Sequence, residues 1–181
     1  MTAKALIVWI FGASASGKET FIKKIHQGKL KSITRALGWN NKKIVFSNKS
    51  IDYVSKNEKD NLGPKREEIV KEVLDLSKEN NSLVLIKGQD LDLENKRPER
   101  LKKLLPSNKH LIVYLHSDSE TLYGRVKKKS WWKKEWDKEG YLKWAKYQVN
   151  LLSKLKGFEI ISLDSGDSGD YMQKSFPPIF E

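Results

Sequence analysis

The chain has 181 residues, of which 38% are hydrophobic and 32% charged, and this suits one compact domain. The absence of cysteine excludes disulfides, thiol catalysis and cysteine-based metal sites, and only three scattered histidines disfavour a histidine-based one. The net charge of +12 favours anionic ligands such as nucleotides, phosphorylated metabolites or nucleic acid, although a lysine-rich solvated surface explains it equally well.

The elements expected along the chain alternate between strands and helices. Residues 5–11 form a short apolar run that predicts a buried strand, and a glycine-rich loop separates it from a helix that begins near Lys18. Four further strands are predicted, at residues 43–47, 82–86, 110–115 and 159–163. Helices are predicted from Gly63-Pro64, from Pro98 and after residues 117–120, whose Ser-x-x-Glu spacing is that of a capping box. The pattern indicates an α/β fold with a five-stranded parallel sheet and helices on both faces.

No apolar run approaches the ~20 residues that a membrane-spanning helix needs. Residues 5–11 lead into the glycine loop and not into a cleavage site, so they are not a secretory signal. We therefore expect a cytoplasmic protein with no membrane contact.

Residues 12–20 are the clearest motif of the chain. Gly12, four residues, Gly17 and Lys18 stand between a predicted strand and a predicted helix, which is the context of a phosphate-binding P-loop. Glycines allow a tight turn whose N–H groups surround phosphate oxygens, and Lys18 balances the charge of the outer phosphates during transfer. We predict that nucleotide is bound by Gly12, Ala13, Ser14, Ala15, Ser16, Gly17, Lys18, Glu19 and Thr20.

One position of this motif departs from the usual pattern. Glu19 replaces the Ser or Thr that normally binds magnesium, and the threonine follows one residue later as Thr20. The Gly-Lys-x-Thr form resembles the adenylate-kinase-like nucleotide and nucleoside kinases, which implies a three-layer P-loop fold, ATP and Mg²⁺ as cofactors, and a phosphate and metal contact for Thr20. Glu19 is interpreted as an acidic first-turn residue of the helix, with a water-mediated magnesium contact as the alternative.

Residues 115–129 resemble the same family at the start of its lid. A strand, an acidic cap and a helix lead to Arg125, and Lys129 follows four residues later. The resemblance implies that Arg125 contacts ATP and that Lys129 stands in for a second arginine, while an exposed basic helix end is the alternative. Residues 125–148 are then a basic helical lid within a single P-loop kinase-like domain that spans residues 1–181.

The predicted lid is rich in lysine and tryptophan. It holds nine Lys or Arg against three Asp or Glu. Four of the six tryptophans lie in it, namely Trp131, Trp132, Trp136 and Trp144. A helical stripe of Trp144, Tyr147, Leu151 and Leu155 predicts packing onto the core, and stacking of one tryptophan on a nucleobase is the second interpretation.

A P-loop kinase also needs an acid near magnesium or the acceptor hydroxyl, usually at the end of a central strand. That end reads Ile-Lys-Gly-Gln-Asp here, with Lys87 where the family often has aspartate. Asp90 is the first candidate for magnesium and acceptor, followed by Asp92, and Asp52 is the other acceptor-side candidate. Candidates for binding an acceptor phosphate are Arg66, Arg97 and Arg100.

These residues predict an ATP-dependent kinase that transfers the γ-phosphoryl group to a nucleotide, nucleoside or similar small acceptor. Two alternatives stay open. The charge and the Trp/Lys segment suggest a polynucleotide 5′-hydroxyl kinase, and Glu19 and Lys87 suggest a nucleotide-binding module without transfer activity. Nucleic acid is the less favoured partner because lysines greatly outnumber arginines. The sequence leaves the oligomeric state open.

Overall fold

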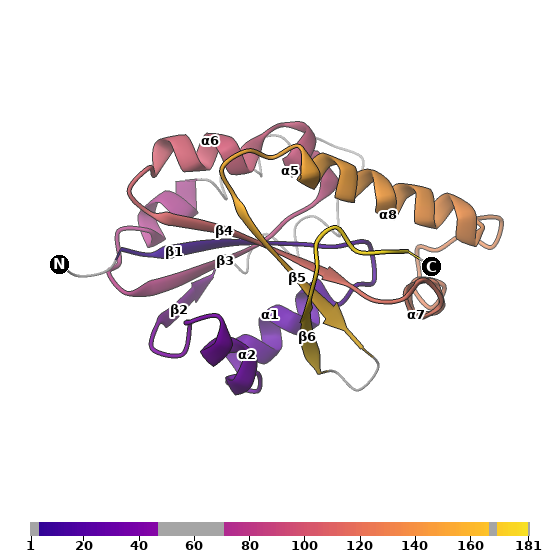
Figure 1. Ribbon diagram of the computed structural model, residues 1–181, viewed down its shortest axis with the longest axis horizontal. Coiled ribbons are helices and arrows are strands. Elements are labelled where there is room, and N and C mark those ends of the chain that lie inside the picture. Colours follow the sequence, from indigo (N-terminus) through magenta and orange to yellow (C-terminus); the bar gives the residue numbers. More distant parts are fainter. Residues whose placement is uncertain (1–3, 47–70, 167–169, 181) are drawn as a thin grey trace.

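A six-stranded sheet lies between two layers of helices in the computed structural model, which describes residues 4–46, 71–166 and 170–180 (Figure 1). The order across the sheet is β2-β3-β1-β4-β5-β6. The strands are β1 (Leu6–Phe11), β2 (Lys43–Phe46), β3 (Ser82–Lys87), β4 (Lys109–His116), β5 (Glu159–Ser165) and β6 (Tyr171–Lys174). The predicted helix from Gly63-Pro64 begins outside the described residues, as do Asp52 and Arg66.

The five predicted strands are all present and run parallel, but the predicted count of five is wrong. β6 pairs antiparallel with β5, from Tyr171 opposite Ser165 to Lys174 opposite Ser162. This edge strand has only four residues, and Tyr171 is the one that is buried. An edge strand with one buried side chain carries no hydrophobic alternation, so the sequence gives no signal for it.

The helices are divided between the two faces of the sheet (Figure 1). One face carries α1 (Lys18–His26) and α2 (Lys31–Ala36), and the other carries α5 (Asp90–Glu94), α6 (Arg97–Leu104) and α8 (Lys138–Ser153). A sixth labelled helix, α7 (Ser119–Val126), lies beyond the carboxyl end of β4, and residues 71–76 are also helical. No helix of the described residues is long and apolar enough to cross a bilayer.

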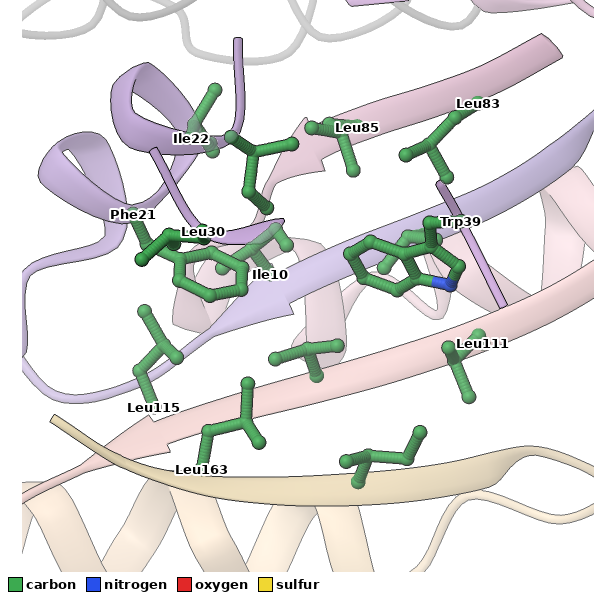
Figure 2. Close-up of a cluster of buried hydrophobic side chains, with 14 of the residues drawn as sticks. Ile10, Phe21, Ile22, Leu30, Trp39, Leu83, Leu85, Leu111, Leu115 and Leu163 are labelled. Atoms are coloured by element: carbon green, nitrogen blue, oxygen red, sulfur yellow. The ribbon is translucent and has the colours of Figure 1, made fainter. Parts of the chain in front are cut away.

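β1 is buried over its whole length because both of its faces are covered. Its alternate residues Leu6, Val8 and Ile10 join the core under α1 and α2, and Ile7, Trp9 and Phe11 join the core under α5, α6 and α8. Figure 2 shows the first of these cores, in which Phe21 and Ile22 of α1 contact the sheet residues. Burying each such side chain contributes about 1.5–3 kcal/mol, so β1 fixes the centre of the sheet and the place where the glycine loop starts.

The start of α7 differs by one residue from the expected capping box. Asp118, not Ser117, is the N-cap, and its carboxylate accepts a hydrogen bond from the Thr121 backbone N–H at 2.8 Å. A carboxylate also interacts favourably with the helix dipole, which favours Asp118 over the neighbouring hydroxyl.

Candidate active site

The glycine loop joins the carboxyl end of β1 to the N-terminus of α1. Its backbone has positive φ at Gly12 (148°), Ala15 (66°) and Gly17 (89°). A Cβ at Gly12 would lie 2.4 Å from both the Leu115 carbonyl oxygen and the Ser16 hydroxyl oxygen, so glycine is required at that position. Such a chain of alternating backbone conformations before a helix N-terminus is the form of an anion-binding nest.

Lys18 folds back over this loop. Its amino group donates hydrogen bonds to the carbonyl oxygens of Gly12 (2.5 Å) and Ala13 (3.0 Å). The pKa of Lys18 is lowered to about 7, chiefly by burial and then by the charges of Lys87 and Lys129, while the Asp90 carboxylate acts in the opposite direction. Three lysines and one aspartate therefore meet at the loop, where an anion would restore the ordinary pKa.

Asp90 lies at the first turn of α5, beside the loop. Its two carboxylate oxygens accept hydrogen bonds from the Trp144 indole N–H and the Gln148 side-chain amide. The amide oxygen of Gln148 in turn accepts a hydrogen bond from the Gly12 backbone N–H at 2.9 Å. Gln148 is buried, so this one side chain connects the first residue of the glycine loop to the carboxylate.

Asp92 and Arg97 form a buried ion pair beside Asp90. Asp92 is fully buried, accepts a hydrogen bond from the Gln89 N–H at 2.8 Å, and lies 3.4 Å from the Arg97 guanidinium. The Asp92 bond forms a capping box with Gln89 at the start of α5. Arg97 is only 5% exposed, so the predictions that Asp92 serves the reaction and that Arg97 binds an acceptor phosphate are not supported by its position.

Arg125 occupies the last turn of α7 and contacts the carboxyl end of β5. Its guanidinium donates to the carbonyl oxygens of Ser165 (2.9 Å) and Gly166 (3.3 Å). The Ser165 hydroxyl lies 3.0 Å from the Ser16 carbonyl oxygen, so Arg125 is linked through Ser165 to the glycine loop. Its predicted contact with ATP stays a prediction.

Glu19 and Thr20 lie on the first turn of α1. The Glu19 carboxylate is 2.9 Å from the Lys23 amino group, and this ion pair holds the pKa of Glu19 below its usual value. The contact agrees with an acidic first-turn residue. The Thr20 side chain is exposed, and its predicted phosphate and metal contacts stay predictions, as does the nucleotide contact of Lys129.

The range predicted as a lid comprises the end of α7, residues 127–137 without regular structure, and the first two thirds of α8. Tyr141 of α8 is buried, and its hydroxyl donates a hydrogen bond to the Ser14 carbonyl oxygen at 2.6 Å. Ala13 of the loop packs with residues of α7 and α8: Leu122, Val126, Tyr141 and Ala145. Closure of this range over a nucleotide stays a prediction.

The sequence did not predict the contacts that four residues make in the site. Gln148, Ser165 and Tyr141 were not predicted to contact the loop, and Trp144 was assigned to packing or base stacking and not to a contact with Asp90. One signal pointed to Gln148: it is the polar member of the buried stripe of α8, which otherwise holds Tyr141, Ala145, Val149 and Leu152. A buried amide needs hydrogen-bond partners, and the glycine loop supplies one.

The described residues contain no group of three or more His, Asp or Glu side chains that could hold a metal by themselves. Mg²⁺ takes one or two carboxylates together with nucleotide phosphates, and it does not need such a cage. Asp90 beside Lys18 fits that requirement because each of its oxygens has a second lone pair beyond the hydrogen bond that it accepts.

No protein-family model matches the chain, and no curated protein matches it. The solved structures similar to it include a chain of the PezAT chromosomal toxin–antitoxin system of Streptococcus pneumoniae, at 16% identity and a TM-score of 0.51, over 95% of this chain and 73% of that one. They also include a gluconokinase from Sinorhizobium meliloti 1021, at 15% identity and a TM-score of 0.48, over 91% and 84% of the two chains. A shikimate kinase from Acinetobacter baumannii, in complex with shikimate, matches at 15% identity and a TM-score of 0.48, over 88% and 83%.

Two of these three structures are of proteins named as kinases. The match to the pneumococcal chain shows a shared fold. At identities of 15–16% the similarity concerns the fold, and the chemistry has to be argued from the residues of this chain.

Proposed function

We propose that this chain is an ATP-dependent phosphotransferase that moves the γ-phosphoryl group to a nucleotide, a nucleoside or a similar small acceptor. The observation that carries the proposal is the placement of Lys18. Its amino group folds over the glycine loop and has a pKa lowered to about 7 by burial and by neighbouring lysines, against the opposing charge of the Asp90 carboxylate. An anionic ligand would strongly stabilise the protonated form of such an amine.

In the proposed reaction the acceptor hydroxyl oxygen forms a bond to the γ-phosphorus as the bond from that phosphorus to the bridging oxygen breaks, and ADP leaves with the electron pair. The hydroxyl proton passes to Asp90 and then to solvent. Lys18 and Arg125 neutralise charge on the phosphates. Asp90 and Thr20 are the residues that would hold Mg²⁺, which when bound neutralises the charge of the phosphates. Asp52 stays a second candidate on the acceptor side, and a cytoplasmic location stays a prediction.

The test is an acceptor screen with γ-³²P-labelled ATP, together with ATP binding by isothermal titration calorimetry. Lys18→Ala should lower transfer about 10²–10³-fold, the cost of removing one stabilising donor from a transition state. Lys23→Ala is the matched control because Lys23 lies on the same helix but forms an exposed ion pair with Glu19.

Three results are distinguishable. A labelled acceptor and sensitivity to Lys18→Ala support the proposal. Binding of ATP that depends on Lys18, with no acceptor labelled, supports a nucleotide-binding module without transfer activity. Binding that is unchanged in Lys18→Ala contradicts both.

A further inference from the structure

Six aromatic rings form a continuous cluster that runs from the glycine loop to the surface. It begins at Tyr141, whose hydroxyl contacts Ser14. The Tyr141 ring lies 6.0 Å from Trp132 and 6.1 Å from Trp144, measured between ring centroids. Trp132 then contacts Tyr123, Trp131 and Trp136 at 5.9, 6.3 and 5.2 Å. Aromatic pairs at such distances stabilise one another, so the outer rings are held in place by the inner ones.

The outer members of this cluster are exposed to an unusual degree. Trp131, Trp136 and Trp144 are 44%, 41% and 39% exposed, and Tyr147, one turn after Trp144, is 43% exposed. Burying such rings stabilises a protein by several kcal/mol each, and exposing three tryptophans together forfeits that gain. Exposed aromatic rings that gather in one place mark a binding surface.

Exposed lysines flank Trp131 and Trp136 in the sequence. Lys128, Lys129, Lys133 and Lys134 are exposed, and Lys133 lies 5.5 Å from the centroid of the Trp136 ring. Lys129 is close enough to Lys18 to influence its pKa, so the positive charge extends to the glycine loop. We call Trp131, Trp136, Trp144 and Tyr147, with these four lysines, the aromatic-basic surface.

We propose that the aromatic-basic surface binds single-stranded nucleic acid, with unpaired bases on the tryptophans and phosphates on the lysines. A single strand combines flat aromatic bases with negative charges, and this surface combines exposed rings with positive charges. A duplex hides its base faces, and neither an acidic peptide nor a lipid headgroup layer supplies a regular succession of flat bases and phosphates. The complementarity therefore selects a single strand.

The surface also reaches the proposed reaction site. Trp144 donates its indole N–H to Asp90, the candidate that would receive the acceptor proton. A strand whose terminal base stacks near Trp144 places its 5′-hydroxyl beside that carboxylate. This part rests on the proposed function: the hydroxyl oxygen would form the bond to the γ-phosphorus, ADP would leave with the electrons of the broken bond, and Asp90 would take the proton.

The experiment measures the fluorescence anisotropy of a fluorescein-labelled 12-nucleotide deoxythymidine strand with the full chain between 50 and 200 mM salt. The double variant Trp131→Ala/Trp136→Ala should weaken binding at least about tenfold, since base stacking on each aromatic ring is worth that much. Lys133→Gln/Lys134→Gln should lower the slope of log affinity against log salt by about 1.4. The charge-matched control Lys103→Gln/Lys156→Gln, on exposed positions of α6 and beyond α8, should leave both unchanged.

Unchanged ATP binding by the tryptophan variant establishes that it is folded, and the lysine pair tests the surface independently. Absence of binding at 50 mM salt, equal affinity for a duplex of the same length, or affinity that is indifferent to the tryptophans overturns the proposal. The proposal is also overturned if heparin displaces the strand equally well from the unchanged protein and from the tryptophan variant, because charge alone then explains binding.

Transfer is scored separately from binding. If the strand binds as expected but γ-³²P-labelled ATP labels no 5′-hydroxyl, the result supports the proposed binding surface and contradicts transfer to nucleic acid. If a small acceptor is labelled while no strand binds, the surface fails and the proposed function stands.

Discussion

The two sides of the candidate site are built in opposite ways. The glycine loop is one contiguous segment, residues 12–20, whose backbone and single lysine form the phosphate side. The acidic side consists of side chains from distant segments, since Asp90 of α5 is held by Trp144 and Gln148 of α8. A backbone nest tolerates most side-chain changes outside its glycines, whereas a side-chain network fails when one member is removed. The predictions below test this difference, from the largest effect to the smallest.

Arg97→Ala should destabilise the acidic side most. It leaves the fully buried Asp92 without the guanidinium that lies 3.4 Å away. Breaking a buried pair costs about 3–5 kcal/mol of unfolding free energy, which urea denaturation would measure. Lys103→Ala, at an exposed position of the same helix, should change the free energy by less than about 0.5 kcal/mol. Equal effects of the two variants would contradict a structural role for the pair.

Asp90→Asn should reduce turnover about 10²-fold, the usual contribution of a positioned proton acceptor, with a smaller change in the KM for ATP. Steady-state kinetics on the acceptor found in the screen would measure both constants. The control is Glu94→Gln on the same short helix, because the Glu94 carboxylate accepts a hydrogen bond from the Tyr147 hydroxyl at 3.0 Å and is not among the residues of the proposed reaction. If Asp90→Asn retains full turnover, the acid of the reaction lies elsewhere, and Asp52 becomes the next candidate.

Gln148→Leu should uncouple the two sides. The change replaces the amide by an apolar side chain of similar size. It leaves the Gly12 N–H and one Asp90 oxygen without the hydrogen bond that Gln148 provides. Each buried group that loses its hydrogen bond costs about 1–3 kcal/mol, so both stability and ATP affinity should fall. Gln173→Leu on β6, where the side chain is exposed, is the matched control. A loss of stability without a loss of ATP affinity would mean that Gln148 only supports packing.

Lys18 should take up about one proton when ATP binds at pH 8. Its pKa in the nucleotide-free protein is about 7, below the ordinary 10.5, and the phosphates should raise it again. ATP affinity should therefore fall as the pH rises above 7. Titration calorimetry in two buffers of different ionisation enthalpy measures the proton, and Lys18→Met should abolish the uptake. A buffer-independent enthalpy for the unchanged protein would contradict the lowered pKa.

The same lowered pKa fixes the sign of a stability effect. Between pH 7 and 10.5 the unfolded chain retains the Lys18 proton while the folded chain has lost it. Stability must then rise with pH across this window, because the unfolded state binds more protons.

The regular elements were predictable where burial imposes a pattern. β1 is apolar throughout, β3 and β4 contain the apolar runs 83–86 and 111–115, and the positions of Phe21, Ile22 and Ile25 on α1 follow from helical spacing. β6 was missed because only Tyr171 is buried, and the short helices α2 and α5 because neither carries a full apolar face.

In the site, too, the local part was predictable from the sequence and the long-range contacts were not. The glycine loop is local, so its spacing predicts its shape. The Asp90–Gln148–Gly12 connection joins residues that are far apart in the chain, and no spacing rule relates them. Its only trace in the sequence is a glutamine among apolar positions of a helix, which shows that a partner is needed but not which one.

The central position of β1 has a consequence for synthesis of the chain on the ribosome. Leu6 pairs with Leu83 on one side and with Lys109 on the other, so this apolar strand emerges long before either partner exists. At ordinary rates of translation roughly 4–15 s pass before Leu83 of β3 is made, and until then six hydrophobic residues have no strand to pair with. Lys4, exposed directly before the strand, places a charge where self-association of nascent chains would otherwise begin. We therefore expect the yield of folded protein to be sensitive to chaperone supply.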